Sequence, residues 1–457
     1  MGLTRKQMLA LMGSAAAAPL IASPASASVT GVPVVRRDVV VLGGGSAGTY
    51  IAVRLGDLGR SVALVEAGDR LGGHTETWHD PRTGGTVDIG VVVLEDEPVV
   101  RRHFGRFGVE LVPVGGLGGE TAYVDFRTGR RVGYTPPVPV ALGAYYELIS
   151  RYGPLDTRID LPDPVPGELV APFREFVAKH DLGSIVPLLF AYGQGIGDLL
   201  GLPALYALNL VGQGVVRNTL AGSYLTTAAH DNSLLYERAT AHLGDDVFLG
   251  ARAVRVTRER SGVRVLVSTP DGPRLIVAGK LVVAYPPRLR AFAGFDLDAY
   301  ERELFGQFVS GAYYTGVVRL AGLPDGLGLD NVAPETPYHL PPLPGLYGVN
   351  PSGIPGVYSV KYGSVAPLSD ARVRRAIRAD LERVAAYPIR FEGFETFAGH
   401  VPFELHVSPE AIAAGFYRRL NGLQGRNHTY WSGAAFHSHN SARIWTGAEA
   451  LLPSIAA

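Results

Sequence analysis

Three glycines with the spacing Gly43-x-Gly45-x-x-Gly48 are the residues of this 457-residue chain with the clearest chemical meaning. Gly43 permits a tight turn, Gly45 lets a pyrophosphate approach the backbone, and Gly48 lets a helix pack closely on a strand. A helix that follows this turn, which includes Ser46, points free N–H groups and the positive end of its dipole at an anion. The spacing therefore predicts a binding site for the phosphates of a dinucleotide.

An acidic residue, Glu66, follows the second apolar run at about the distance expected for a ribose-binding acid. Its carboxylate can accept both hydroxyl hydrogens of the adenosine ribose, and its charge repels a 2′-phosphate, so NADP is disfavoured. A second glycine pair, Gly72-Gly73, lies close behind it between Arg70 and His74. These residues can approach the pyrophosphate or a ribityl chain, which a nicotinamide-binding domain does not need. The sequence therefore indicates FAD rather than NAD.

Two other interpretations of the glycine turn remain open. The segment Gly44-x-Ser46-x-Gly48 also fits the G-x-S-x-G nucleophile elbow of hydrolases, which lies between a strand and a helix. That elbow normally follows several strands, whereas this strand is the first of the mature chain, and the elbow has no use for Glu66. A glycine-rich structural turn without a ligand is the second alternative.

The order of these residues resembles the flavin amine oxidase superfamily. That family has a glutamate, an arginine and then Gly-Gly-Arg at the places of Glu66, Arg70 and residues 72–74, so His74 stands where an arginine is usual. The resemblance continues in two longer segments: residues 87–90, where Gly90 ends the segment beside the flavin ring, and residues 282–287, which match a Val-Ala-x-Pro-Pro strand. It also implies that the backbone of Val254 would meet adenine and that Gly433 would lie beside the ribityl chain. Ala434 stands where the family has an acid.

A narrower resemblance is to FAD oxidoreductases related to β-cyclopiazonate dehydrogenase. It is carried by residues 70–74, 192–195, 225–233 and 433–439. The resemblance implies FAD, a split cofactor domain and an inserted substrate domain, but it does not identify the substrate. The chain has no cysteine, which independently excludes a cysteinyl-flavin bond, disulfides and thiolate metal sites.

The elements that must position these residues follow from the hydrophobic pattern. Residues 37–42 and 61–65 are apolar runs typical of buried parallel strands, and residues 49–58 have helical spacing. Asp271-Gly272 predicts a hairpin turn between two strands. Further helices are expected over residues 171–179, 232–241, 369–386, from 408 onward, and over 440–452, where Pro453 should stop the helix.

Together these features predict an α/β fold, a Rossmann-like FAD-binding domain of the amine oxidase/glutathione-reductase type with an inserted α+β substrate domain. The expected FAD-binding domain is discontinuous and comprises residues 36–95, 225–290 and 400–457. The expected substrate-binding domain comprises residues 96–224 and 291–399.

Catalytic residues stay unassigned. Amine oxidases often have a lysine near the flavin, but the comparable strand, residues 313–319, contains none, which leaves Lys361 as a remote candidate. Candidates for the substrate pocket are Tyr313, Tyr314, Trp431 and His437. The two tyrosines would also fit an ordinary core. An extended His437-x-His439 segment would point both rings to one side, but two ligands without an acidic partner do not make a catalytic metal site, so no metal is expected.

Charge and the N-terminal residues narrow the setting. The chain has 42 basic and 42 acidic residues, so no global field draws it to nucleic acid. Residues 4–7, the apolar run 8–22 and the Ala-x-Ala site at 25–27 predict a signal peptide over residues 1–28, which resembles a twin-arginine signal with lysine in the second place. The protein is therefore expected to be exported, as a secreted or cell-envelope protein. No later stretch has the roughly 20 apolar residues of a membrane span.

The function that fits these features is an FAD-dependent oxidoreductase. It would remove a hydride from an amine or a similar small apolar organic substrate and pass the electrons to oxygen or another acceptor. An FAD-dependent isomerase or desaturase of an unsaturated apolar compound is the first alternative, and a non-catalytic flavin-binding protein is the second.

Overall fold

The computed structural model describes residues 31–115 and 120–457, of which Val34–Ala457 form one compact unit. The expected signal peptide, residues 1–28, lies outside the described residues. None of the helices in the described part of the chain has the length and apolar character needed to cross a membrane.

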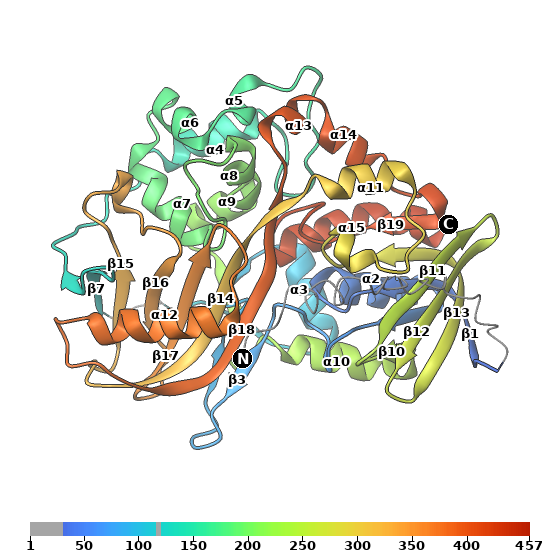
Figure 1. Ribbon diagram of the computed structural model, residues 1–457, viewed down its shortest axis with the longest axis horizontal. Coiled ribbons are helices and arrows are strands. Elements are labelled where there is room, and N and C mark those ends of the chain that lie inside the picture. The colour runs from blue at the N-terminus through green and yellow to red at the C-terminus, as the bar shows by residue number, and fades with distance from the viewer. Residues whose placement is uncertain (1–30, 116–119) are drawn as a thin grey trace, which may run out of the picture. The chain divides into compact units, whose positions relative to one another are not determined.

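The first sheet contains the predicted strand–turn–helix–strand unit (Figure 1). Its strands are β1 (Val34–Leu42), β2 (Val62–Val65), β10 (Val247–Phe248), β11 (Arg252–Glu259), β12 (Gly262–Thr269), β13 (Gly272–Val283) and β19 (Thr429–Trp431). They are arranged in the order β10-β2-β1-β13-β12-β11, and β19 pairs with the far end of β13. β10, β2, β1 and β13 run parallel, while β11, β12 and β13 form antiparallel hairpins that include the predicted turn at residues 271–272.

Strand β1 lies in the middle of the sheet because both of its faces are apolar. Val39 and Val41 pack into one hydrophobic core, whereas Val40 and Leu42 pack into a second core on the opposite face. Successive side chains of a strand point to opposite faces, so a continuous apolar run is what a strand covered on both sides requires.

One face of this sheet is covered by helices α2 (Ser46–Asp57), α3 (Pro98–Arg106), α10 (Leu234–Leu243) and α15 (Ser441–Ala456). Tyr50 of α2 stacks on Trp445 of α15 with ring centroids 5.5 Å apart. Helix α15 begins where expected, with the Asn440 side chain accepting the N–H groups of its first turn, but it does not stop at Pro453. Because Pro453 lies in the last turn, its missing N–H removes only one hydrogen bond and the helix continues to Ala456.

The second sheet consists of β7 (Glu120–Asp125), β8 (Arg130–Arg131), β14 (Val309–Ala321), β15 (Leu327–Asn331), β16 (Gly345–Pro351), β17 (Val357–Ser364) and β18 (Arg390–His406). Its order is β18-β14-β17-β16-β15-β7-β8. Helix α12 (Asp370–Arg383), which the sequence predicted over a slightly longer range, covers one face with Val373, Ile377 and Leu381 (Figure 1).

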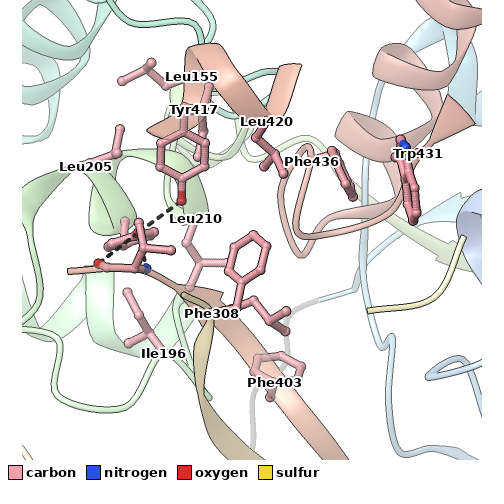
Figure 2. Close-up of a cluster of buried hydrophobic side chains, with 14 of the residues drawn as sticks. Leu155, Ile196, Leu205, Leu210, Phe308, Phe403, Tyr417, Leu420, Trp431 and Phe436 are labelled. Atoms are coloured by element: carbon pink, nitrogen blue, oxygen red, sulfur yellow. Dashed lines mark hydrogen bonds between the residues drawn. The ribbon is translucent and has the colours of Figure 1, made fainter. Parts of the chain in front are cut away.

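Short helices gather over one end of the second sheet, as the green segments of Figure 1 show. They are α4 (Leu142–Ser150), α5 (Gly167–Val170), α6 (Phe173–Lys179), α7 (Val186–Tyr192), α8 (Ala204–Leu210) and α9 (Gln213–Ala221), joined by α11 (Ala299–Gly306), α13 (Pro409–Ala413) and α14 (Phe416–Asn421). Their shared core, drawn in Figure 2, extends from Leu155 and Leu205 to Trp431 and Phe436.

The smaller sheets join these parts. They are formed by β3 (Thr77–His79) with β4 (Thr86–Asp88), and by β5 (Leu94–Glu95), β9 (Tyr224–Thr227) and β6 (Leu111–Pro113). Strand β18 runs through the expected domain boundary at residue 400. The division into a cofactor domain and a substrate domain therefore stays a prediction.

Candidate functional site

The glycine turn at the end of β1 has the close packing that its spacing predicted. A Cβ atom at Gly48 would collide with the carbonyl oxygen of Gly43, so only glycine lets the first turn of α2 lie this close to the strand. Gly43 itself has a φ of +101°, a conformation that favours glycine. The N-cap residue of α2, Gly45, provides no side-chain hydrogen bond, which leaves N–H groups of the first turn available to an anion.

The second glycine pair meets the first one. Gly72 N–H donates to the carbonyl of Gly44 at 2.9 Å, and a Cβ at Gly73 would lie 3.0 Å from the Cα of Gly45. The two loops therefore form one surface of bare backbone. Arg70 supports this surface from behind, because its guanidinium donates to the carbonyl of Thr75 at 2.7 Å.

Glu66 lies beside the same turn. One carboxylate oxygen accepts the N–H of Gly44 at 2.6 Å, and the other accepts the N–H of Gly68 at 2.6 Å. These two hydrogen bonds hold the carboxylate at the edge of the turn, where the ribose of a dinucleotide would lie.

A cavity of about 490 Å³ extends from these loops. One end, which we call the nucleotide end, is lined by residues predicted for the two glycine loops and for ribose binding, namely Gly43, Gly45, Ser46, Glu66, Gly72 and Gly73. The predicted residues His74, Gly90, Gly433 and Ala434 line it as well. Gly48 and Arg70 lie behind this lining and shape it.

Val254 is not brought to the cavity. It lies on β11, the strand at the outer edge of the sheet, and 51% of its surface is exposed. The residue of this segment that reaches the end of β2 is Ala251, whose N–H donates to the carbonyl of Glu66 at 2.8 Å. No sequence signal distinguished Ala251 from Val254, because the register of the loop before β11 is decided by its tertiary contacts.

The other end of the cavity, which we call the substrate end, has aromatic walls. The rings of Tyr192 and Tyr224 stack with centroids 5.6 Å apart, and those of Tyr313 and Phe403 lie 5.2 Å apart. Leu210 completes this apolar wall, and Figure 2 shows that Leu210 and Phe403 also belong to the core beneath it.

Of the four residues predicted for the substrate pocket, Tyr313 lines the cavity. Tyr314 points to the opposite face of β14, where its hydroxyl donates to the carbonyl of Leu368 at 2.7 Å, because neighbouring strand residues alternate in direction. Trp431 is buried in the core against Phe305. The ring of His437 is bound to the carbonyl of Thr157 at 2.8 Å. These three residues therefore lie outside the lining.

Three histidine rings, those of His74, His400 and His439, line the middle of the cavity. The centroids of His74 and His400 are 4.3 Å apart, and Nε2 of His400 lies 3.2 Å from the hydroxyl of Thr315. His439 does not share an environment with His437, because residues 434–437 form a turn instead of an extended segment. The extended segment that would point both rings to one side is therefore not formed. Among the described residues, no group of three His, Cys, Asp or Glu side chains has the arrangement of a metal site.

Burial keeps these imidazoles neutral at pH 7. The His74 side chain is accessible from the cavity, and the protein that encloses this cavity, with a smaller contribution from Arg70, lowers the pKa of the ring to about 4. Burial, with a smaller contribution from His74, lowers the pKa of His439 to about 3. Nε2 of His439 accepts the backbone N–H of Glu404 at 3.1 Å, so Nδ1 carries the hydrogen of the neutral ring.

Glu404 is a buried acid directly behind this wall. Its Oε2 atom lies 3.6 Å from Nε2 of His439 and has no hydrogen-bond partner in the described residues. Its φ of +47° is unusual for a residue with a side chain. Burial raises the pKa of Glu404 to about 8, so its carboxyl group is mainly protonated at pH 7.

A flavin dinucleotide fits the residues of the nucleotide end. The backbone at Gly45 and at Gly433 borders open space, because a Cβ added at either glycine would meet no atom within 3.6 Å. Free N–H groups of α2 suit phosphate, and Glu66 suits the ribose.

Comparisons with known proteins agree with this geometry. Residues 47–305 match the family described as flavin containing amine oxidoreductase. An FAD-dependent oxidoreductase of Emericella nidulans is 38% identical over 436 residues, which cover 93% of this chain and 92% of the relative. The β-cyclopiazonate dehydrogenase of Aspergillus oryzae is 34% identical over 430 residues, which cover 92% of this chain and 93% of the relative.

Solved structures share the fold at lower identity. A CLA-producing fatty acid isomerase from P. acnes superposes with a TM-score of 0.74 at 20% identity, covering 92% of this chain and 98% of that one. Putrescine oxidase bound to putrescine superposes with a TM-score of 0.67 at 18% identity, covering 93% and 99%. These likenesses confirm the predicted fold class, a Rossmann-like FAD-binding part combined with a substrate-binding part.

We predict that Glu66→Gln weakens FAD binding. The amide can accept fewer hydrogen bonds than the carboxylate and carries no charge, so the dissociation constant for FAD should rise about tenfold or more. Titration of the flavin-free protein with FAD, followed by fluorescence, measures this change. Glu237→Gln, which alters an exposed acid on α10, serves as the matched control and should leave the constant unchanged. Equal constants for wild type and Glu66→Gln would contradict the assignment.

Replacing Glu404 with glutamine should reduce the pH dependence of stability. The folded chain holds the Glu404 proton up to a pKa of about 8, whereas the unfolded chain releases it near 4.5. The stabilisation is therefore full below pH 4.5 and is lost as the pH rises through about 8. Urea unfolding between about pH 6 and about pH 9 should show a smaller loss of unfolding free energy in Glu404→Gln than in wild type. The exposed-acid variant Glu175→Gln should behave like wild type, and parallel curves for Glu404→Gln and wild type would refute the assignment.

Proposed function

The chain belongs to the flavin-containing amine oxidoreductase family and is an FAD-dependent oxidoreductase, and from this premise we propose that it removes a hydride from a small, largely apolar organic substrate. The observation that carries this proposal is the continuity of one cavity between the glycine loops and the aromatic walls. Bound FAD supplies the hydride acceptor and later passes the electrons to oxygen or another acceptor.

The chain's own residues would bind and orient the substrate. Tyr192, Tyr224 and Phe403 provide flat apolar surfaces, which suit a ring or a conjugated chain and exclude water. Nδ1 of His439 makes no hydrogen bond with the described residues, so it can donate one to a polar substrate atom. Tyr313, whose hydroxyl donates to Gln194 at 3.4 Å, supports the wall next to it.

The names of similar proteins are consistent with more than one outcome for the removed hydride. One relative is a β-cyclopiazonate dehydrogenase, and one structural neighbour is a fatty acid isomerase. Amine oxidases often have a lysine on the strand that corresponds to β14. Here the cavity side of β14 has Thr315 and no lysine. An isomerase would return the hydride to the substrate and consume no acceptor.

We expect the purified protein to show the absorption bands of oxidised flavin and to lose them when an oxidisable substrate is added without oxygen. A panel of cyclic amines and conjugated polyenes would identify the substrate class, and acceptor consumption equal to substrate loss would establish net oxidation. Tyr313→Ala should slow bleaching at least tenfold while the protein keeps its flavin, because the substrate wall loses a ring. Turnover without acceptor consumption would establish isomerisation instead, and a colourless protein that takes up no FAD would refute the proposal.

We also propose that the protein is exported. Support comes only from the sequence, since the basic start, the apolar run 8–22 and the Ala-x-Ala site at 25–27 lie outside the described residues. Expression in a bacterium with twin-arginine transport should yield a mature protein that begins near residue 28, as N-terminal sequencing would show. Replacing Arg5 and Lys6 with glutamine should block processing. An N-terminus that stays intact in wild type would contradict export by this route.

A further inference from the structure

Lys361 is a lysine in the wall of the cavity. It lies on β17, where its neighbours Val360 and Tyr362 pack towards α12 and its own side chain takes the opposite face. Across the sheet it pairs with Thr315 of β14, the residue that contacts His400. This register places its ammonium group at the substrate end, on the sheet opposite the one that carries the glycine loops.

The ammonium group has no partner of opposite charge at close range. Within the described residues, Nζ of Lys361 has neither a hydrogen-bond acceptor within 3.5 Å nor a carboxylate within 4.0 Å. Asp330 of β15 lies in the same cross-strand row as Lys361, with only Gly348 of β16 between them. Its Oδ1 lies 3.0 Å from the position that a Cβ at Gly348 would take, so the carboxylate reaches over this glycine without coming within 4.0 Å of Nζ of Lys361. Burial lowers the pKa of the Lys361 ammonium, and Asp330 restores it only in part.

The other charged groups that line the cavity are already bound or neutral. Glu95 is paired with the guanidinium of Arg443 at 2.5 Å, and Glu66 is bound by two backbone N–H groups. The three histidines are neutral at pH 7 because burial lowers the pKa of each ring. Among the described residues, the cavity lining therefore presents one ammonium group and no carboxylate without a partner. Asp330 lies outside this lining and attracts the ammonium group without contacting it.

We propose that Lys361 binds an anionic group of the substrate, so that the natural substrate is an aromatic or conjugated organic acid, a carboxylate or an ionised enol, and not a protonated amine. A partly buried charge without a direct partner is costly, and an anionic ligand offsets that cost by forming a charge-assisted hydrogen bond. A protonated amine would meet a like charge in the same space and be rejected. The aromatic walls provide the apolar part of the recognition. This inference rests on the proposed function, because it assigns the substrate class of the same cavity.

Lys361 could instead serve the flavin, and the experiment separates the two roles. Cinnamate and cinnamylamine share one conjugated skeleton and differ in charge. Each is titrated into the flavin-loaded protein without oxygen, and binding is measured from the change in the flavin absorption spectrum. Wild type should bind cinnamate more tightly than cinnamylamine. Lys361→Met should weaken cinnamate binding about 30-fold or more, while Lys361→Arg should keep the preference for the acid.

The control variant is Lys179→Met, which removes an exposed lysine of α6 and should bind cinnamate as wild type does. The proposal is overturned if wild type binds cinnamate no more tightly than cinnamylamine, or if Lys361→Met binds cinnamate like wild type. It is also overturned if Lys361→Met loses FAD or changes the flavin spectrum before any ligand is added, since the lysine would then serve the cofactor. The measurement needs bound flavin but no turnover, so a failure of hydride removal would be seen separately, as the absence of bleaching.

Discussion

The backbone contact between the two glycine loops is the constraint on which the nucleotide end of the cavity depends. Gly72 donates to the carbonyl of Gly44, and the first turn of α2 rests directly on Gly43 because Gly48 has no side chain. Any Cβ in this contact would separate the strand, the helix and the second loop. The same contact places the N–H of Gly44 where it holds the carboxylate of Glu66. The predicted contacts to phosphate and to ribose would therefore depend on one close packing of backbone.

The substrate end depends on a different constraint, the alternation of side chains along β14 and β17. One face of these strands packs on α12, so the residues between must face the cavity. This alternation brings Tyr313 and Lys361 to the wall and sends Tyr314 away from it. The histidines enter this wall uncharged because the surrounding protein disfavours their protonated form. The result is an apolar, aromatic wall that carries one ammonium group.

Local features of the chain predicted which residues gather at the glycine-lined end of the cavity. The turn at Gly43, the acid at Glu66 and the glycine pair after it lie within about 30 residues of each other, in a unit whose geometry is largely the same wherever it occurs. The prediction for α15 was right at its start and wrong at its end, because Pro453 lies in the final turn, where a helix tolerates the loss of one hydrogen bond. Val254 was placed near adenine by resemblance alone, and the course of the loop before β11 puts Ala251 next to Glu66 instead.

The sequence by itself determined the fold class, the cofactor and the glycine-lined half of the site, because these depend on residues that are close together in the chain and on backbone geometry that few sequences permit. Only the tertiary structure decided the other half. His400, His439 and Lys361 carry no short-range signal, since cross-strand register and the turn at residues 434–437 bring them to the cavity. Their protonation is likewise a property of their surroundings, because burial, and not residue type, decides which of these groups holds a charge.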